Sequence, residues 1–191
     1  MRITSGIYKG RRIKMPEGIR PSQEKVRKAL FDILGEVTDA SFLELFAGSG
    51  AVGIEALSRG AKTAVFVENN PHCLKALKSN FAFLTPDTYN LLPVDAENAV
   101  EKLCRQGRLK FDIIFLDPPY LKAIPLRPET EAGGSPAKKI LQMLGACDIL
   151  ARNGFTVIQH SKKESLPEES GSLSLIKQAI YGDTVLSFYK R

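Results

Sequence analysis

Tryptophan is absent from this 191-residue chain, and cysteine and histidine are scarce. The three cysteines (Cys73, Cys104 and Cys147) are too few and too far apart for a disulfide framework or a zinc site, so we expect packing residues in a reducing compartment. With only His72 and His160 as further soft ligands, we expect no metal centre. No apolar run approaches the ~18 residues of a membrane span, and the N-terminus lacks an apolar signal core. We therefore expect a cytoplasmic protein that contacts no membrane.

The composition is that of one ordinary globular domain, with 43% hydrophobic, 8% aromatic and 25% charged residues. It excludes collagen, a coiled coil and wholesale disorder. The net charge is +6, but residues 1–30 hold nine basic and two acidic side chains, so the other 161 residues carry −1. Such a basic arm favours a polyanion partner, and a merely solvated charged face is the alternative. Nothing in the sequence calls for a dimer, so we expect a monomer.

An aromatic residue lies among the basic ones in Tyr8-Lys9-Gly10-Arg11-Arg12, which favours nucleic acid because the ring can stack on a base. Residues 1–15 alternate enough to predict a short hairpin with a glycine turn. We therefore treat residues 1–20 as a basic extension and residues 21–191 as one compact domain. The candidate RNA-binding residues are Arg2, Lys9, Arg11, Arg12, Lys14 and Arg20.

Strand and helix patterns alternate along the rest of the chain. Buried runs predict strands at 42–46, 63–67, 91–94, 112–116 and 155–159, and amphipathic segments between them predict helices, the last at 139–150. Residues 121–138 and 161–172 read as loops, residues 152–154 as a turn, and Gly182-Asp183 as the turn of a closing hairpin over 173–189. Such alternation predicts an α/β fold whose parallel sheet is covered on both faces.

Each of the first four predicted strands is followed by a glycine-rich or acidic motif at its carboxyl end, where ligands of such sheets bind. The first is Gly48-x-Gly50-x-x-Gly53, which matches the dinucleotide fingerprint between a strand and a helix. Glu68 ends the second strand, where a carboxylate can accept ribose hydroxyls, and Asp95 ends the third, where it can accept from an adenine amine. The pattern indicates an adenosine-containing cofactor and does not decide between NAD and S-adenosylmethionine.

The tetrapeptide Asp117-Pro118-Pro119-Tyr120 follows the fourth strand and favours methyl transfer to an exocyclic amine. The Asp117 carboxylate and the Pro118 carbonyl can each accept one N–H of the amine, which orients its lone pair. The carboxylate also opposes the positive charge that develops on nitrogen. Tyr120 can stack on a target base that has left its own stack. A rigid turn after a strand is the structural alternative.

With these motifs, the chain resembles the bacterial 16S ribosomal RNA guanine-N2 methyltransferases, a branch of the class I S-adenosylmethionine-dependent enzymes. The resemblance covers nearly the whole chain. Its motifs are Arg2-Ile3-x-x-Gly6-x-x-Lys9-Gly10-Arg11, Arg20-Pro21-Ser22, Leu45-Phe46-Ala47-Gly48-Ser49-Gly50, residues 55–61, Glu68 and Asp117-Pro118-Pro119-Tyr120. Gln159 stands near a place where the family has Glu.

The resemblance implies a Rossmann-like, mostly parallel seven-stranded sheet with helices on both faces, a C-terminal antiparallel hairpin and a small N-terminal hairpin extension. It implies S-adenosyl-L-methionine as cofactor, and one guanine of small-subunit RNA, within a partly assembled subunit, as substrate. The implied cofactor residues are Phe46, Gly48, Ser49, Gly50, Glu68, Asn69, Asp95 and Ala96, and the implied catalytic residues are Asp117, Pro118 and Tyr120.

Three alternatives remain open at this point. An NAD-linked oxidoreductase could use the same glycine loop, but the chain shows no catalytic Tyr-Lys, Ser or His arrangement after the fourth strand. A non-catalytic RNA-binding module would not need Asp117. Among methyltransferases, the target could be a DNA adenine N6 or a protein glutamine, although 191 residues leave little room for a DNA target-recognition domain.

Overall fold

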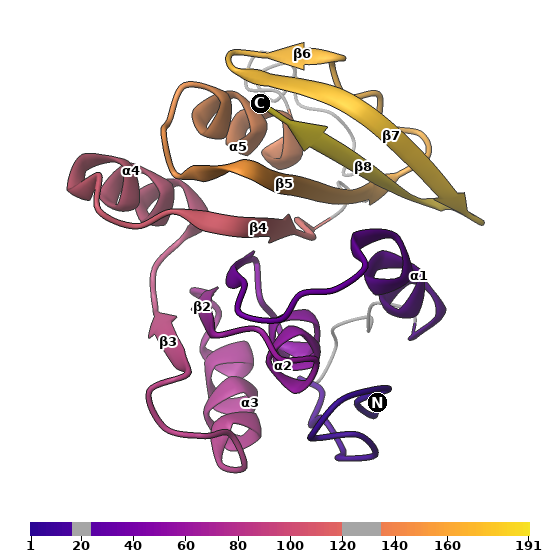
Figure 1. The fold of residues 1–191 in the computed structure, drawn as a ribbon, viewed down its shortest axis with the longest axis vertical. Coiled ribbons are helices and arrows are strands. Elements are labelled where there is room, and N and C mark those ends of the chain that lie inside the picture. Colours follow the sequence, from indigo (N-terminus) through magenta and orange to yellow (C-terminus); the bar gives the residue numbers. More distant parts are fainter. Residues whose placement is uncertain (17–23, 120–134) are drawn as a thin grey trace.

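The computed structural model describes residues 1–16, 24–119 and 135–191. Its centre is a single sheet with the strand order β3-β2-β1-β4-β5-β8-β7-β6 (Figure 1). The helices are α1 (Glu24–Leu34), α2 (Ala51–Ser58), α3 (Pro71–Phe81), α4 (Ala96–Gln106) and α5 (Pro136–Gly145). The strands are β1 (Ser41–Leu45), β2 (Thr63–Val67), β3 (Tyr89–Leu92), β4 (Phe111–Leu116), β5 (Leu150–Ser161), β6 (Glu169–Ser170), β7 (Leu173–Tyr181) and β8 (Thr184–Lys190).

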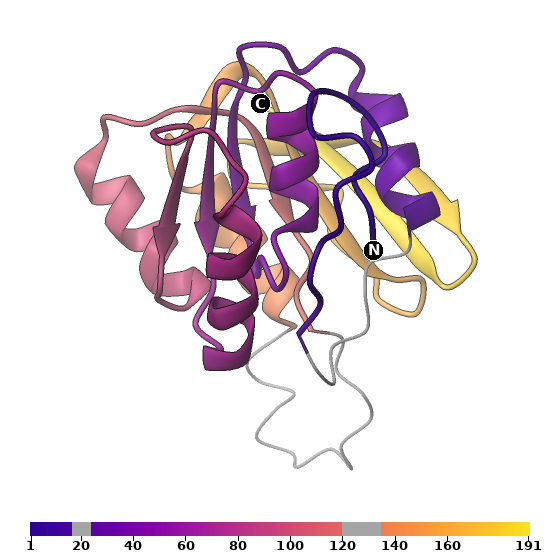
Figure 2. The ribbon, with the colours of Figure 1, turned by 90° about the horizontal axis from the view of Figure 1, so that it is seen from below.

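The helices form one layer on each face of the sheet. The first five strands pair in parallel, and β5-β8-β7-β6 continue the sheet in antiparallel fashion. One core joins α1, α2, α3 and the N-terminal residues to one face, and a second core joins α4 and α5 to the other (Figure 2). Because the parallel strands all run the same way, their carboxyl ends meet at one edge, which is where a ligand site is expected.

The structure confirms several predictions that rest on short local motifs. Strand β2 covers Thr63–Val67 as predicted. The side chain of Asn70 caps α3 by accepting from the backbone N–H groups of His72 and Cys73, with Pro71 in the first turn. Gly182, with a φ of 63°, lies in the turn between β7 and β8. Cap and turn residues act through their nearest neighbours, so the sequence predicts them well.

Three expectations about the second half of the sheet are wrong. The sheet has eight strands, not seven, because the short strand β6 lies in the expected loop at 161–172. The expected turn at 152–154 lies inside β5, where the pairing with β4 shifts register. A Cβ at Gly154 would come within 2.7 Å of the Asp112 carbonyl oxygen, so the glycine permits a close approach of two strands. Helix α5 ends at Gly145, and Leu150 already belongs to β5.

The expectation of three unpaired cysteines is also wrong. Cys104 and Cys147 form a disulfide with a Cα–Cα distance of 5.8 Å, whereas Cys73 is free and buried. The partners are 43 residues apart in the sequence, but α4 and α5 pack together on the same face of the sheet. The proximity therefore arises from tertiary packing, which residue spacing does not reveal.

Candidate functional site at the carboxyl edge of the sheet

The loop between β1 and α2 has an unusual backbone. Phe46, Gly48 and Gly50 all have positive φ angles, of 58°, 55° and 73°. This conformation suits glycine, but it is strained for Phe46, and such strain concentrates at functional sites. A Cβ at Gly48 would meet only the Phe46 carbonyl oxygen, at 4.0 Å, whereas a Cβ at Gly50 would collide with Leu77 at 2.6 Å. Gly48 therefore leaves room for a ligand, and Gly50 serves the packing of the loop.

Glu44 lies beneath this loop, and the sequence reasoning missed it. It is a buried side chain in β1, and its Oε2 accepts a hydrogen bond of 2.8 Å from the Gly53 backbone N–H. A Cβ at Gly53 would come within 2.8 Å of the same oxygen. The third glycine of the fingerprint thus serves the contact between α2 and the sheet and not a ligand. A single charge inside the apolar run at 42–46 was the available signal, because burying an unpartnered carboxylate is costly.

Burial raises the pKa of Glu44 to about 8, and the nearby charge of Asp117 acts in the same direction. In the unfolded chain this carboxyl ionises near pH 4.5. The folded state therefore holds a proton that the unfolded state loses, and the resulting stability declines as the pH rises from about 4.5 through 8.

We expect Glu44→Gln to flatten that decline, since glutamine does not titrate. The wild-type slope from this group should reach at most about 1.4 kcal/mol per pH unit. Urea unfolding at pH 5.5, 7 and 8.5 measures it. Parallel slopes in the two proteins would show that Glu44 does not carry the proton.

Glu68 joins the end of β2 to the glycine loop. Its Oε2 accepts from the Gly48 N–H at 2.8 Å, and its Oε1 accepts from the N–H groups of Asn69 and Asn70 at 2.9 and 2.8 Å. These bonds hold the carboxylate beside Gly48, where the sequence predicts a cofactor ribose. Asn69 is exposed next to it.

Asp95 lies near the end of β3, but its observed role is local. The strand ends at Leu92, and Asp95 is the N-cap of α4, accepting from the Asn98 N–H at 2.9 Å. This bond holds the pKa of Asp95 below its usual range. The prediction that Asp95 ends the strand is therefore wrong by three residues, and its contact with adenine stays a prediction. Ala96, the next residue, is buried.

Asp117 follows β4, next to β1 in the sheet, and Leu116 pairs with Leu45 in register. The glycine loop and Asp117 thus leave neighbouring strands at the same edge. The Oδ2 of Asp117 accepts a hydrogen bond of 2.8 Å from the Nε2 of Gln159 on β5, a partner that the sequence did not reveal. Pro118 is buried and Pro119 is exposed. Tyr120 lies outside the described residues.

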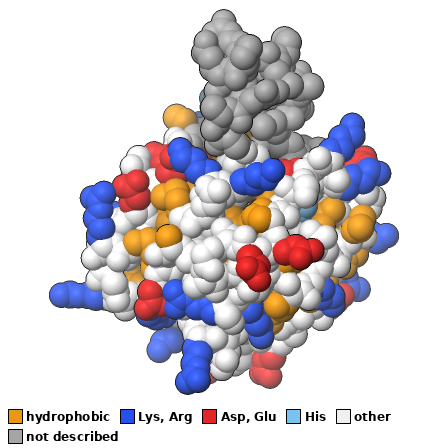
Figure 3. All heavy atoms as spheres, turned by 90° about the horizontal axis from the view of Figure 1, so that it is seen from above, with side chains coloured by type: hydrophobic (Ala, Val, Ile, Leu, Met, Phe, Trp, Pro, Cys, Tyr) orange, Lys and Arg blue, Asp and Glu red, His pale blue; other side chains and the backbone are white. Residues whose placement is uncertain are grey.

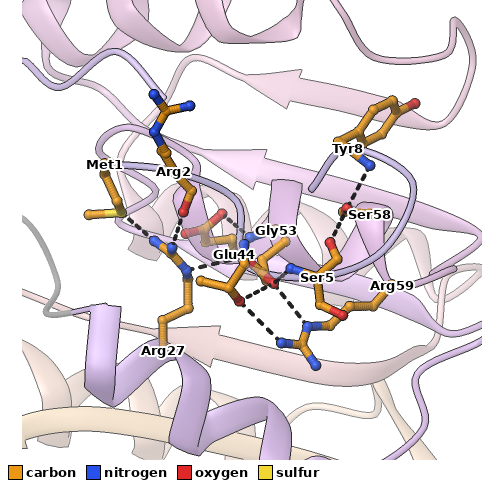
Figure 4. Close-up of polar contacts among 11 residues, drawn as sticks. Met1, Arg2, Ser5, Tyr8, Arg27, Glu44, Gly53, Ser58 and Arg59 are labelled. Atoms are coloured by element: carbon orange, nitrogen blue, oxygen red, sulfur yellow. Dashed lines mark hydrogen bonds and ion pairs between the residues drawn. The ribbon is translucent and has the colours of Figure 1, made fainter. Parts of the chain in front are cut away.

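Residues 1–16 are docked on α1 and α2 by a buried polar network (Figure 4). Glu55 accepts from the Thr4 N–H and hydroxyl and from the Ser5 N–H, at 2.7–3.0 Å. It also forms ion pairs with Arg27 at 3.4 Å and Arg59 at 3.0 Å, and the Glu55 and Arg27 side chains are fully buried. Arg27 in turn donates to the sulfur of Met1 and the carbonyl oxygen of Arg2.

The same segment runs along α2 towards the glycine loop. Its turn lies at the end of α2, where the Ile7 N–H donates to the Ser58 carbonyl oxygen at 2.8 Å. Further along, the buried Asn80 side chain bonds both the N–H and the carbonyl oxygen of Lys14 and donates to the Ser49 carbonyl oxygen at 2.9 Å. One amide thus links the basic segment to the glycine loop. Regular pairing is limited to a single bridge between Arg2 and Arg12, so the expected hairpin is irregular.

The basic residues expected to bind RNA are exposed in this segment, namely Arg2, Lys9, Arg11, Arg12 and Lys14. Arg20 lies outside the described residues. The guanidinium of Arg11 lies 5.7 Å from the centre of the Phe83 ring, and Tyr8 packs edge-on against the same ring. On the face seen from β6 and β7, by contrast, basic, acidic and hydrophobic side chains are interspersed (Figure 3).

His160 is buried on β5. Its Nε2 lies 2.8 Å from the Ser187 hydroxyl, and its Nδ1 lies 3.0 Å from the Ser161 carbonyl oxygen. Burial lowers its pKa. A neutral ring with both nitrogens engaged fits a structural role.

Two other kinds of site are absent from the described ranges. No three His, Cys, Asp or Glu side chains gather as metal ligands among residues 1–16, 24–119 and 135–191. None of the helices described in these ranges is long and apolar enough to cross a membrane.

The chain is similar to known proteins over nearly its whole length. A family model described as "Conserved hypothetical protein 95" matches residues 1–190. The chain is 34% identical to the Bacillus subtilis protein named "Putative rRNA methyltransferase YlbH", over 100% of this chain and 99% of that protein. It is 29% identical to the "Ribosomal RNA small subunit methyltransferase D" of Escherichia coli K12, over 100% and 90%.

A solved structure of a hypothetical protein from Thermus superposes with a TM-score of 0.81 and 30% identity, over 100% of this chain and 99% of that one. The solved structure of the "Putative methyltransferase yhhF" from Escherichia coli superposes with a TM-score of 0.78 and 27% identity, over 100% of this chain and 97% of that one. The chain is a member of the Conserved hypothetical protein 95 family and has the α/β fold of class I methyltransferases.

Proposed function

We propose that this protein transfers a methyl group from S-adenosyl-L-methionine to the exocyclic N2 amine of a guanine in small-subunit ribosomal RNA. The observation that carries the proposal is the position of Asp117-Pro118 directly beside the glycine loop, on the adjacent strand of the same sheet edge. The names of the relatives at 34% and 29% identity support the reaction and the RNA class.

The residues at this edge fit S-adenosylmethionine. The open backbone at Gly48 and the Glu68 carboxylate held beside it would take the ribose, with Phe46, Ser49, Gly50 and Asn69 around them. Asp95 and Ala96 would lie at the adenine. When bound, this cofactor supplies an electrophilic methyl group on a positively charged sulfur. The acidic side chains of the site suit that charge.

On the acceptor side, Asp117 and the Pro118 carbonyl would each accept one N–H of the guanine amine. The amine lone pair is delocalised into the base, so its orientation contributes much of the rate. The Asp117 carboxylate opposes the charge that develops on nitrogen. The product then loses one proton to water, so no strong base is needed. Tyr120 would stack on the base.

RNA recognition would rest on the exposed basic residues of segment 1–16, with Arg20. This segment runs from the far end of α2 to the glycine loop, which gives RNA a path along α2 to the reacting edge. We further propose that residues 1–20 act as the RNA-binding extension of a compact domain at 21–191. In this account a cytoplasmic monomer without metal acts on a partly assembled subunit.

We expect Arg11→Ala with Arg12→Ala to weaken RNA binding, because each neutralised phosphate releases counterions. The slope of log affinity against log salt should become shallower by about 1.4–1.8, for two phosphate contacts. Fluorescence anisotropy at several salt concentrations measures it. The control is Arg105→Ala with Arg108→Ala, which removes the same charge near the start of β4. Equal salt slopes in the two double variants would show that segment 1–16 does not contact the RNA phosphates.

The cofactor and the acceptor are tested together with purified protein. Calorimetric titration should show binding of S-adenosylmethionine and none of NAD, and label from the methyl donor should enter small-subunit RNA. Tight NAD binding without S-adenosylmethionine binding would contradict the proposal and favour an oxidoreductase. Label in DNA adenine or in protein glutamine would support methyl transfer as the reaction and would show that the proposed RNA acceptor is wrong.

A further inference from the structure

Gln159 is placed beside Asp117 by the register of two central strands. Leu116 on β4 pairs with Ile158 on β5, so the residues that follow them, Asp117 and Gln159, emerge side by side. Their side chains meet in a hydrogen bond of 2.8 Å from Nε2 to Oδ2. Neighbouring residues in register on parallel strands point to the same face, so this contact follows from the fold.

The Gln159 amide has little freedom to move. The residue is 5% exposed, and β5 is held between β4 and β8, where Gln159 pairs with Leu186. Buried amides are costly unless they are hydrogen-bonded, so the bond to Asp117 is favoured. A strand fixed on both sides therefore presents one N–H donor to the carboxylate.

The carboxylate that receives this bond lies in an acidic setting. Glu44 of β1 is buried and interacts electrostatically with Asp117, and Arg27 of α1 interacts with Glu44 in turn. Two nearby carboxyls compete for ionisation, since like charges disfavour one another. The uncharged amide of Gln159 donates to Asp117 and so stabilises the ionised form of that carboxyl. The proton then stays on Glu44.

We infer that Gln159 is a positioning residue that orients the Asp117 carboxylate and keeps it ionised for the acceptor amine. The inference rests on the proposed function, because it assigns Asp117 to the acceptor. Gln159 touches neither substrate nor cofactor in this account and acts through Asp117 alone.

The test uses the full chain, S-adenosylmethionine and small-subunit RNA. Gln159→Leu keeps the volume and removes the donor. We expect kcat to fall about 10-fold, with the affinity for S-adenosylmethionine unchanged, and the acidic limb of the kcat–pH profile to move to higher pH. Gln159→Glu retains a polar side chain and adds a carboxyl, so its acidic limb should move further in the same direction.

Gln178→Leu is the matched control. Gln178 lies on β7, and its amide donates to the Ser187 hydroxyl at 2.9 Å. The Gln178→Leu change removes an amide donor from the same sheet and leaves the bond from Gln159 to Asp117 in place. Both kcat and the pH profile should therefore equal those of the wild type. Thermal melts of all variants check the fold.

Asp117→Asn separates the two possible failures. If it retains full turnover, the proposed role of Asp117 is wrong. If it loses turnover while Gln159→Leu and Gln159→Glu keep the wild-type kcat and pH profile, the positioning role alone is overturned. A shift of the acidic limb in both Gln159 variants, absent from Gln178→Leu, supports the inference.

Discussion

Asp117→Ala should reduce methyl transfer about 10³-fold while binding of the methyl donor survives. The carboxylate acts on the acceptor amine, and the loss of one preorganised charge that opposes a developing one costs this much in comparable sites. The cofactor residues at the ends of β1 and β2 remain intact in the variant. Single-turnover kinetics and calorimetric titration of S-adenosylmethionine measure the two properties separately.

Asp112→Ala is the control for this experiment. Asp112 lies on the same strand, near its beginning, and accepts a hydrogen bond from the Ser41 N–H at 2.8 Å. Its loss should cost about 1 kcal/mol of stability and no turnover. Turnover that survives in Asp117→Ala would exclude the proposed role, and equal losses in both variants would indicate a folding defect.

The second large effect is expected from Glu55→Ala. The change leaves Arg27 buried without its partner and removes the acceptor for Thr4 and Ser5. Breaking a buried ion pair typically costs about 3–5 kcal/mol. Segment 1–16 should then detach, which would make it sensitive to protease. Urea denaturation gives the free energy of unfolding, and limited proteolysis reports on the segment.

Glu101→Ala is the matched control for Glu55→Ala. It also removes one carboxylate from an ion pair, but that pair is exposed. Glu101 pairs with Arg105 on α4 at 3.0 Å, with side chains 51% and 80% exposed. Such a pair contributes less than about 1 kcal/mol. If Glu55→Ala costs no more than this control, the buried network does not hold the segment. Glu55→Gln keeps one acceptor oxygen and loses the charge and the second acceptor, so its cost in stability should lie between those of the two alanine variants.

The sequence predicted the parts of the fold that depend on near neighbours. Asn70 and Pro71 act within one turn of a helix, and the run at 63–67 is too apolar to lie elsewhere than in the sheet. The glycine turn and Asp117 were found because both mark the ends of buried strands. Parallel strands then bring such ends to one edge without further information.

What the sequence missed depends on contacts between distant residues. The Cys104–Cys147 bond needs two helices packed side by side. The turn expected at 152–154 lies inside β5 because β4 pairs with Leu150 before it and with Phe155 after it, and this pairing outweighs local preference. The bonds from Gln159 to Asp117 and from Asn80 to Ser49 join separate elements, and the sequence does not show which partner either amide has.

The most direct test of the account is mass mapping of small-subunit ribosomal RNA from cells with and without this protein. The account predicts that one guanine loses a single methyl group on N2 in the deleted strain. It also predicts that the wild-type gene restores the methyl group and the Asp117→Ala gene does not. Identical modification maps in the two strains, or restoration by Asp117→Ala, would contradict it.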